Sequence, residues 1–166
     1  QATHINAAND VITFEPDAAN FSCLAQNVGT NPKIIAYNAA LGEHSGRVST
    51  AAHQPNDNGC IRVIEVDGGP VPMRPIDELE LQSCDLIWLD IEGYEEKALR
   101  GAEQTIARHR PPVIIEENMT ATMHGLEPGG ARAWLEARGY RRHAKFGNDT
   151  LFKPAPLVSD IATEES

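Results

Sequence analysis

An apolar run that ends in two carboxylates and a glycine constrains the fold of this chain more than any other feature of its sequence. Residues 85–95 read Asp-Leu-Ile-Trp-Leu-Asp-Ile-Glu-Gly-Tyr-Glu, which predicts a short buried strand ending at Leu89 and a helix soon afterwards. In an open α/β sheet, ligands bind beyond the carboxyl ends of the strands. Asp90 and Glu92 are therefore predicted to lie where chemistry would occur.

Strands alternate with helices along the rest of the chain. Short β-branched or apolar runs predict strands at 11–14, 34–37, 86–89 and 112–115, with shorter strands near 140–143 and 150–153. Apolar residues at helical spacing predict helices at 17–29, 98–110 and 131–139. Residues 59–75 are interpreted as an irregular hairpin that Pro72 confines to a sheet edge. This order predicts a mostly parallel, three-layer α/β sandwich.

Composition limits the domain count and the class of ligand. The 166 residues, 18.1 kDa in mass, suit one α/β domain, placed at 1–153, and the acidic, Pro-containing residues 154–166 suit a flexible tail. A net charge of -10 argues against nucleic acid and favours a neutral or cationic small ligand.

The cysteines and the hydropathy bear on location. Three cysteines without paired spacing give no disulfide framework or zinc site. The chain has neither an apolar run long enough to span a membrane nor a readable signal peptide. We therefore expect a cytoplasmic protein without a membrane partner.

Three acids at predicted strand ends are candidate site residues. Glu15 follows the first strand and could accept hydrogen bonds from both hydroxyls of a ribose, although it could equally cap the helix that begins near Asp17. Asp90 is expected to be partly buried, and with Glu92 beside it one pKa of the pair should rise, as the proton acceptor for an alcohol requires. The alternative is that Asp90 and Glu92 only interact favourably with the dipole at the N-terminus of the following helix, which is the role that we assign to Glu95.

Two further possibilities concern His124 and a metal. His124, in the loop after strand 112–115, could serve as a base or orient a hydroxyl, although a loop histidine is usually solvated. Asp90, Glu92 and Glu116 offer oxygen ligands of the kind that Mg²⁺ or Mn²⁺ prefers. Their spacing does not require a metal, and none is expected.

In their order along residues 11–117, several motifs resemble the FkbM-type methyltransferases. They are Val11-Ile-Thr-Phe-Glu-Pro-Asp17, Ala40-Leu-Gly42, Asp77-Glu-Leu79, Asp90-Ile-Glu-Gly-Tyr-Glu95, Leu99-Arg-Gly-Ala102 and Pro112-Val-Ile-Ile-Glu116. The resemblance implies an S-adenosylmethionine-dependent enzyme with a Rossmann-like, class I seven-stranded sheet. Its acceptor would be a small-molecule or glycan hydroxyl, on a sugar, a glycan or a secondary metabolite.

The resemblance also implies roles for individual residues. Glu15 would hold the cofactor ribose, and Asn38 and Ala39 would border the adenine. Asp90, as a cofactor-binding and catalytic residue, and Glu92 would lie near the departing methyl group and the acceptor.

The chain departs from the family pattern in two places. Trp88 stands where the family commonly has Lys. The family's first strand and its Asp/Gly-rich cofactor loop should precede Val11, but only ten residues without glycine do. We therefore expect an N-terminally incomplete domain that lacks this central strand and loop. If these residues are the whole polypeptide, cofactor binding should be weak or absent.

Two other functions stay open. A noncatalytic α/β binding or assembly module derived from such an enzyme would fit the missing loop. A nicotinamide-dependent oxidoreductase, which also places an acid on a ribose, ranks last because the sequence contains no G-x-G-x-x-G.

Overall fold

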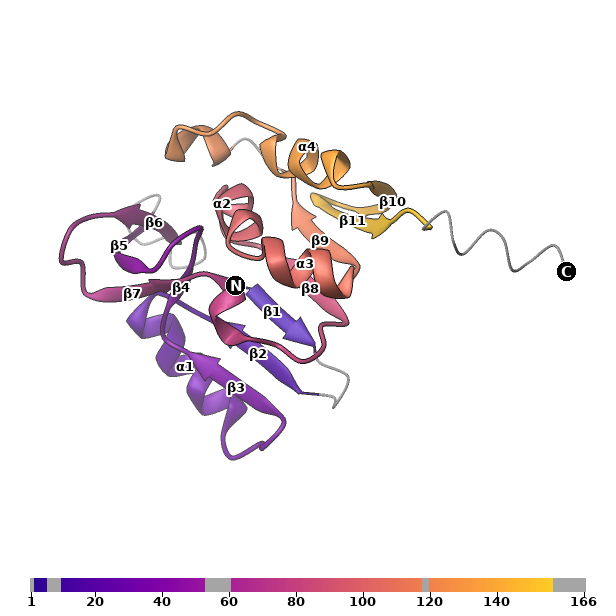
Figure 1. Ribbon diagram of the computed structural model, residues 1–166. Helices are drawn as coiled ribbons and strands as arrows, with labels where there is room; N and C mark the ends of the chain where they lie inside the picture. Colours follow the sequence, from indigo (N-terminus) through magenta and orange to yellow (C-terminus); the bar gives the residue numbers. More distant parts are fainter. Residues whose placement is uncertain (1, 6–9, 53–60, 118–119, 157–166) are drawn as a thin grey trace, which may run out of the picture.

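The computed structural model describes residues 2–5, 10–52, 61–117 and 120–156, which form two sheets flanked by helices (Figure 1). The larger sheet has the order β10-β11-β9-β8-β1-β2-β3. Its strands are β1 (Ala2–Ile5), β2 (Val11–Phe14), β3 (Ile34–Tyr37), β8 (Leu86–Leu89), β9 (Val113–Glu116), β10 (Tyr140–Phe146) and β11 (Asp149–Pro154). The smaller sheet, of order β4-β7-β5-β6, contains β4 (Ala40–Leu41), β5 (Gly46–Ala52), β6 (Ile61–Glu65) and β7 (Val71–Arg74).

The helices connect and cover these strands. They are α1 (Ala18–Val28), α2 (Glu95–Arg100), α3 (Glu103–His109) and α4 (Gly130–Ala137), with the 3₁₀ turns η1 (Ile76–Leu79) and η2 (Thr120–His124). No helix in the described part of the chain is long and apolar enough to cross a membrane.

The larger sheet is mixed, which corrects the prediction of a mostly parallel sheet. Only β2 with β3 and β8 with β9 are parallel neighbours, whereas β1 runs antiparallel to β2 and β8, and β11 runs antiparallel to β9 and β10. Because β1 opposes both of its neighbours, β2, β3, β8 and β9 all point the same way. Their carboxyl ends therefore share one edge of the sheet, as the sequence predicted.

A strand occupies the central position that was expected to be empty. In β1, Ala2 pairs with Phe14 on one side and Leu89 on the other, and Ile5 pairs with Val11 and Leu86. This pairing satisfies the backbone groups of β2 and β8, which would otherwise be exposed along both strands. Since β1 is antiparallel, it begins at the edge where β2 and β8 end. Residues 2–5 thus supply a first strand, but not one that runs toward a cofactor loop at that edge.

The main core lies between the larger sheet and α2, α3 and α4. The burial of side chains alternates along β8 and β9, so that Ile87 and Leu89 are buried while Trp88 points to the opposite face with 43% of its surface exposed. On that opposite face α1 covers β2 and β3 (Figure 1). No described helix covers Trp88 and its cross-strand neighbour Ile114. Among the helices that the structure describes, α1 alone therefore forms the third layer of the predicted sandwich.

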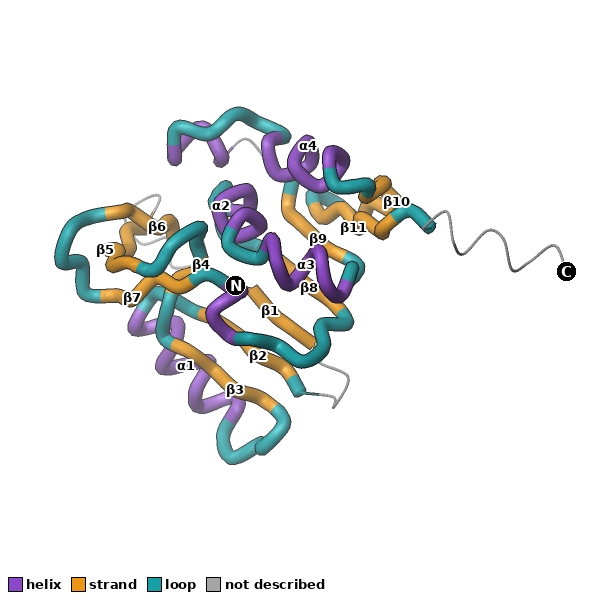
Figure 2. The backbone as a smooth tube through the Cα atoms, viewed as in Figure 1, coloured by secondary structure: helices purple, strands orange, loops and turns teal. Residues whose placement is uncertain are grey.

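The helix predicted at 98–110 is two helices in the structure (Figure 2). The break falls at Gly101 and Ala102, where the chain passes very close to Gly42. A Cβ atom on Gly101 would lie 2.0 Å from the Gly42 carbonyl oxygen. The predicted apolar stripe is nevertheless buried on both sides of the break, because Leu99, Ala102 and Ile106 all belong to the main core.

The smaller sheet corrects the predicted hairpin at residues 59–75. β6 and β7 both pair with β5 and not with each other, so β7 is an interior strand. Pro72 is tolerated there because β4 pairs only with Met73 and Arg74, leaving no β4 residue opposite the proline. Val48, Met73 and Tyr94 form the centre of a second, smaller core beneath this sheet.

The C-terminal boundary of the domain stays a prediction. β11 ends at Pro154, the first residue of the predicted tail, and residues 157–166 of that tail lie outside the described residues.

Candidate active site

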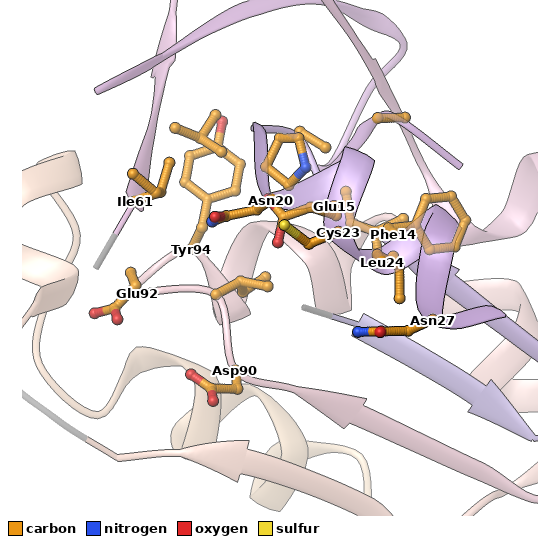
Figure 3. Close-up of a pocket in the computed structure, with 16 residues that line it drawn as sticks. Phe14, Glu15, Asn20, Cys23, Leu24, Asn27, Ile61, Asp90, Glu92 and Tyr94 are labelled. Carbon is orange, nitrogen blue, oxygen red and sulfur yellow. The ribbon is translucent and has the colours of Figure 1, made fainter. Parts of the chain in front are cut away.

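A cavity of about 600 Å³ lies at the edge where the four co-directional strands end. Its walls come from the end of β2, one side of α1, the residues after β3, strand β6 and the turn after β8. Figure 3 shows Glu15, Asp90 and Glu92 around it. A cavity of this size is typical of a cofactor or small-molecule site.

Glu15 is held at the cavity wall by its own backbone and by the first turn of α1. Its amide donates to the Tyr37 carbonyl oxygen at 3.1 Å, and its Oε1 accepts from the Asp17 amide at 2.8 Å. The side chain that caps α1 is Asp17, whose Oδ1 accepts from Ala19 N and Asn20 N. Glu15 is only 5% exposed, and its Oε2 makes no hydrogen bond within the described ranges. The helix-capping alternative for Glu15 is therefore wrong, and Oε2 can accept from a ligand.

The turn after β8 presents Asp90 and Glu92 in an unusual backbone conformation. Glu92 has a φ of 56°, a region that residues other than glycine seldom adopt and that often marks functional sites. Asp90 is exposed rather than partly buried as predicted, because the buried strand already ends at Leu89.

Gly93 fits this turn for a reason that the sequence did not reveal. Its φ is 90°, and a Cβ atom would lie 2.4 Å from both Ala121 N and Thr120 C. The backbone of η2 therefore approaches Gly93 so closely that no side chain fits at this position.

Glu95 fixes the turn, a role that the sequence interpretation missed. Its Oε1 accepts from Ile91 N at 3.1 Å and from Gly93 N at 3.2 Å, so it bonds to the amides on both sides of Glu92. The side chain is 4% exposed, and burial raises its pKa to about 7. A glutamate just after a glycine turn, able to reach back to free amides, was the signal available. We had assigned Glu95 only to the first helical turn.

Three carboxylates gather beside the cavity. Oxygen atoms of Asp90, Glu92 and Glu116 all lie within 4.8 Å of one another. Burial is the main cause that raises the pKa of Glu116, and the charges of Asp90 and Glu92 raise it further. Acidic groups of this kind are common without a metal, and the metal-free site stays a prediction.

A protein-family comparison decides the relationship of this chain. The model of the methyltransferase FkbM domain matches residues 2–142. The chain belongs to the FkbM methyltransferase family.

Two individual relatives agree with this assignment. The chain is 25% identical over 121 residues to the 2-O-methyltransferase NoeI of Sinorhizobium fredii (strain NBRC 101917 / NGR234), covering 58% of this chain and 49% of NoeI. It also resembles the crystal structure of methyltransferase FkbM from Methylobacillus flagellatus KT, with a TM-score of 0.52, 25% identity, and coverage of 85% of this chain and 35% of that one. The chain therefore spans about half of NoeI and about a third of the solved protein.

Two predicted site residues of this FkbM-family chain, Asn38 and His124, do not line the cavity. Ala39 lies in its wall, but Asn38 turns its side chain to the backbone, where Nδ2 donates to the carbonyl oxygens of Glu15 at 2.8 Å and Pro16 at 3.2 Å. Asn38 therefore fixes the segment that carries Glu15. The strand-end position of Asn38 was visible in the sequence, whereas the direction of its side chain was not.

His124 lies behind the turn instead of inside the cavity. Its Nε2 lies 3.0 Å from the Glu92 carbonyl oxygen and, because that oxygen can only accept, Nε2 must carry the proton. The imidazole packs edge-on against Tyr94, with 5.0 Å between the ring centroids, and burial lowers its pKa. His124 thus holds the backbone of Glu92, and its geometry does not support the predicted role as a base in this cavity.

Trp88, the other departure from the family pattern, is also outside the cavity. It lies on the opposite face of the sheet from the core. The presence of tryptophan where the family commonly has lysine therefore changes that face of the sheet and not the described wall of the cavity.

Proposed function

We propose that this protein transfers a methyl group from S-adenosylmethionine to a hydroxyl oxygen. One observation carries the proposal: Glu15 from the end of β2 and the Asp90–Glu92 turn from the end of β8 line the same cavity. Membership of a methyltransferase family supports the reaction class. The name of NoeI, a 2-O-methyltransferase, supports oxygen as the acceptor atom.

The residues of the cavity fit the cofactor. A buried carboxylate with one oxygen already held by Asp17 N is suited to accept from the two ribose hydroxyls through charge-assisted hydrogen bonds. Ala39 and Ala40 offer a small apolar wall for the adenine, and Ile61 and Val63 of β6 line the same cavity. When bound, the cofactor supplies an electrophilic methyl group on a sulfonium.

Asp90 is our candidate for the group that accepts the hydroxyl proton. Its carboxylate is exposed at the cavity, where an acceptor hydroxyl can reach it. Oxygen atoms of Glu92 and Glu116 lie within 4.8 Å of an Asp90 oxygen, so the hydroxyl proton would pass to a cluster of acidic groups. Orienting the hydroxyl in line with the methyl donor would account for much of the rate, because correct alignment removes a large entropic barrier.

We infer an acceptor of the sugar, glycan or secondary-metabolite class. The carboxylates of Asp90 and Glu92 at the cavity suit hydroxyl-rich molecules, because they can accept hydrogen bonds from hydroxyl groups. The test is transfer of a tritiated methyl group from S-adenosylmethionine to a panel of monosaccharides, oligosaccharides and polyketide alcohols. We expect labelled product with at least one of them and a loss of at least about 100-fold in rate for Asp90→Asn, the usual scale of general-base catalysis. The conservative control Glu80→Gln should keep the wild-type rate.

A noncatalytic binding module is the second candidate. The antiparallel β1 favours it, because the strand between Glu15 and Asp90 does not run toward the cavity. Such a module would bind S-adenosylmethionine or a sugar without forming labelled product. Binding with no transfer to any acceptor on the panel would favour this candidate over the enzyme.

A further inference from the structure

A second cavity, of about 360 Å³, lies on the other side of Tyr94. Arg62, Lys97 and His124 line it together with Glu65, and we refer to it as the basic cavity. Val63 and Tyr94 belong to the walls of both cavities. The basic cavity therefore adjoins the proposed active site.

The charges of the basic cavity contrast with the rest of the molecule. The chain has a net charge of -10, but among the residues that the structure describes, two cationic side chains and one carboxylate line this cavity. The Glu65 carboxylate already has two partners: it lies 2.5 Å from Lys97 Nζ and accepts a hydrogen bond from the Tyr94 hydroxyl. Lys97 also sits over the Tyr94 ring, 4.9 Å from its centroid. One carboxylate can balance only one of the two cations, so the charge of Arg62 is not compensated by the described residues of the lining.

Arg62 also carries a hydrogen-bond donor that the described residues do not satisfy. Its Nε is shielded from solvent and has no hydrogen-bond partner within the described ranges. Buried polar groups in native proteins nearly always have a partner, above all when they belong to a charged side chain. A carboxylate or phosphate oxygen is the partner that a guanidinium binds best.

We propose that the basic cavity binds an anionic group of the acceptor, a carboxylate or a phosphate, while a hydroxyl of the same molecule reaches Asp90. This inference rests on the proposed methyl transfer, which requires an acceptor beside the Asp90–Glu92 turn. His124 connects the two sites, because it lines the basic cavity and its Nε2 donates to the Glu92 carbonyl oxygen. The acceptor would accordingly be an acidic or phosphorylated sugar or metabolite, and neutral analogues would be poor substrates.

Nuclear magnetic resonance titration tests this proposal without any need for turnover. Glucose 6-phosphate, glucuronate and glucose serve as a phosphate, a carboxylate and a neutral probe, and the ring signals of His124 report binding at the cavity. We expect saturable shifts with at least one anionic sugar and at least 10-fold weaker binding of glucose. Equal affinity for all three sugars, or no shift with either anionic sugar, would overturn the proposal.

Matched variants locate the effect. Arg62→Gln and Lys97→Gln should each weaken binding of the anionic sugar at least 10-fold, and Arg62→Lys should retain more affinity than Arg62→Gln. Arg108→Gln, which removes an exposed cation on α3, should bind as the wild type does. Undiminished affinity in folded Arg62→Gln protein would refute the assignment.

A parallel titration separates this inference from the proposed function. Calorimetry with S-adenosylmethionine should give the same affinity in Arg62→Gln as in the wild type, because Arg62 does not line the larger cavity. Failure of the wild type to bind S-adenosylmethionine would contradict the proposed reaction. Failure to bind anionic sugars while cofactor binding persists would contradict only the anion site.

Discussion

Glu95 links the stability of this protein to the shape of its candidate site. Its carboxyl group spans Glu92 by accepting from Ile91 N and Gly93 N, which keeps Glu92 at its positive φ. Burial raises the pKa of Glu95 from 4.5 to about 7, so folding makes the ionised form costly. The same side chain therefore stabilises the turn and opposes folding at high pH.

The pH dependence of stability should reveal this cost. The unfolded chain releases the Glu95 proton near pH 4.5 and the folded protein only near pH 7, so the free energy of unfolding falls as pH rises between these values. The loss should be on the order of 3 kcal/mol. Glu95→Gln cannot ionise, yet its amide oxygen can still accept from both backbone amides. Urea unfolding should therefore show that the free energy of unfolding of Glu95→Gln rises relative to that of the wild type from about pH 5 to about pH 8. A stability difference that does not change with pH would contradict the assignment.

At the level of single residues, the sequence indicated where acids would gather but not what each one touches. Glu15, Asp90 and Glu92 were identified because they follow predicted strands, and the topology brings them to one cavity. Glu95 lies in the first turn of α2 as expected, but its contacts and those of His124 were not predicted, because they depend on side-chain direction and on η2, a segment with no clear periodicity. The catalytic and cofactor-binding roles of the predicted site residues stay predictions.

At the level of elements, η1 and α3 are joined by a side-chain cap across a long stretch of sequence. α3 has no capping side chain of its own, and Asp77 of η1 supplies one. The Asp77 carboxylate accepts from Gln104 N at 2.9 Å, from Thr105 N at 2.8 Å and from Thr105 Oγ1 at 2.7 Å. This contact gives the Asp77-Glu-Leu79 motif a structural purpose.

Removal of this cap should destabilise the fold. We expect Asp77→Ala to lower the free energy of unfolding by about 1–2 kcal/mol, the usual effect of losing an N-cap. Asp77→Asn keeps a side-chain oxygen and should lose less. Asp67→Ala, which removes an exposed loop acid, should change stability little. Chemical denaturation of the three variants measures these differences, and equal stabilities for Asp77→Ala and Asp67→Ala would show that the cap is not important.

Local periodicity predicted most elements of the larger sheet correctly. Strands β2, β3 and β8 have the predicted bounds, and the apolar stripe from Ala98 to Ile106 is buried as expected. Pairing partners were the weak point, since β5 inserts between β6 and β7, and close approach of Gly101 to Gly42 splits the predicted helix. Both features depend on contacts between distant segments, which a local pattern does not contain.

At the level of the whole molecule, the two faces of the larger sheet differ. One face is packed under α2, α3 and α4, whereas the other carries α1 and an exposed Trp88. The apolar run of β8 predicted a buried strand, but such a run does not show whether a helix covers each of its two faces. Trp134, in α4, is 6% exposed and belongs to the main core.

Fluorescence of the two tryptophans should report this difference. In Trp134→Phe, the remaining emission from Trp88 should be red-shifted and readily quenched by acrylamide, because the indole is accessible to solvent. In Trp88→Phe, emission from Trp134 should be blue-shifted and protected. Strong protection of Trp88 would mean that the exposed face is covered in solution.

The central claim is that the ends of β2 and β8 build one cofactor cavity, and calorimetric titration with S-adenosylmethionine tests it most directly. Loss of charged hydrogen bonds to the ribose in Glu15→Ala should weaken binding by about 10-fold to 100-fold, on the scale of 1.5–3 kcal/mol. Glu15→Gln, which can still accept from Asp17 N, should show a smaller loss, and Glu136→Gln on α4 should match the wild type. Unchanged affinity in Glu15→Ala would contradict the account.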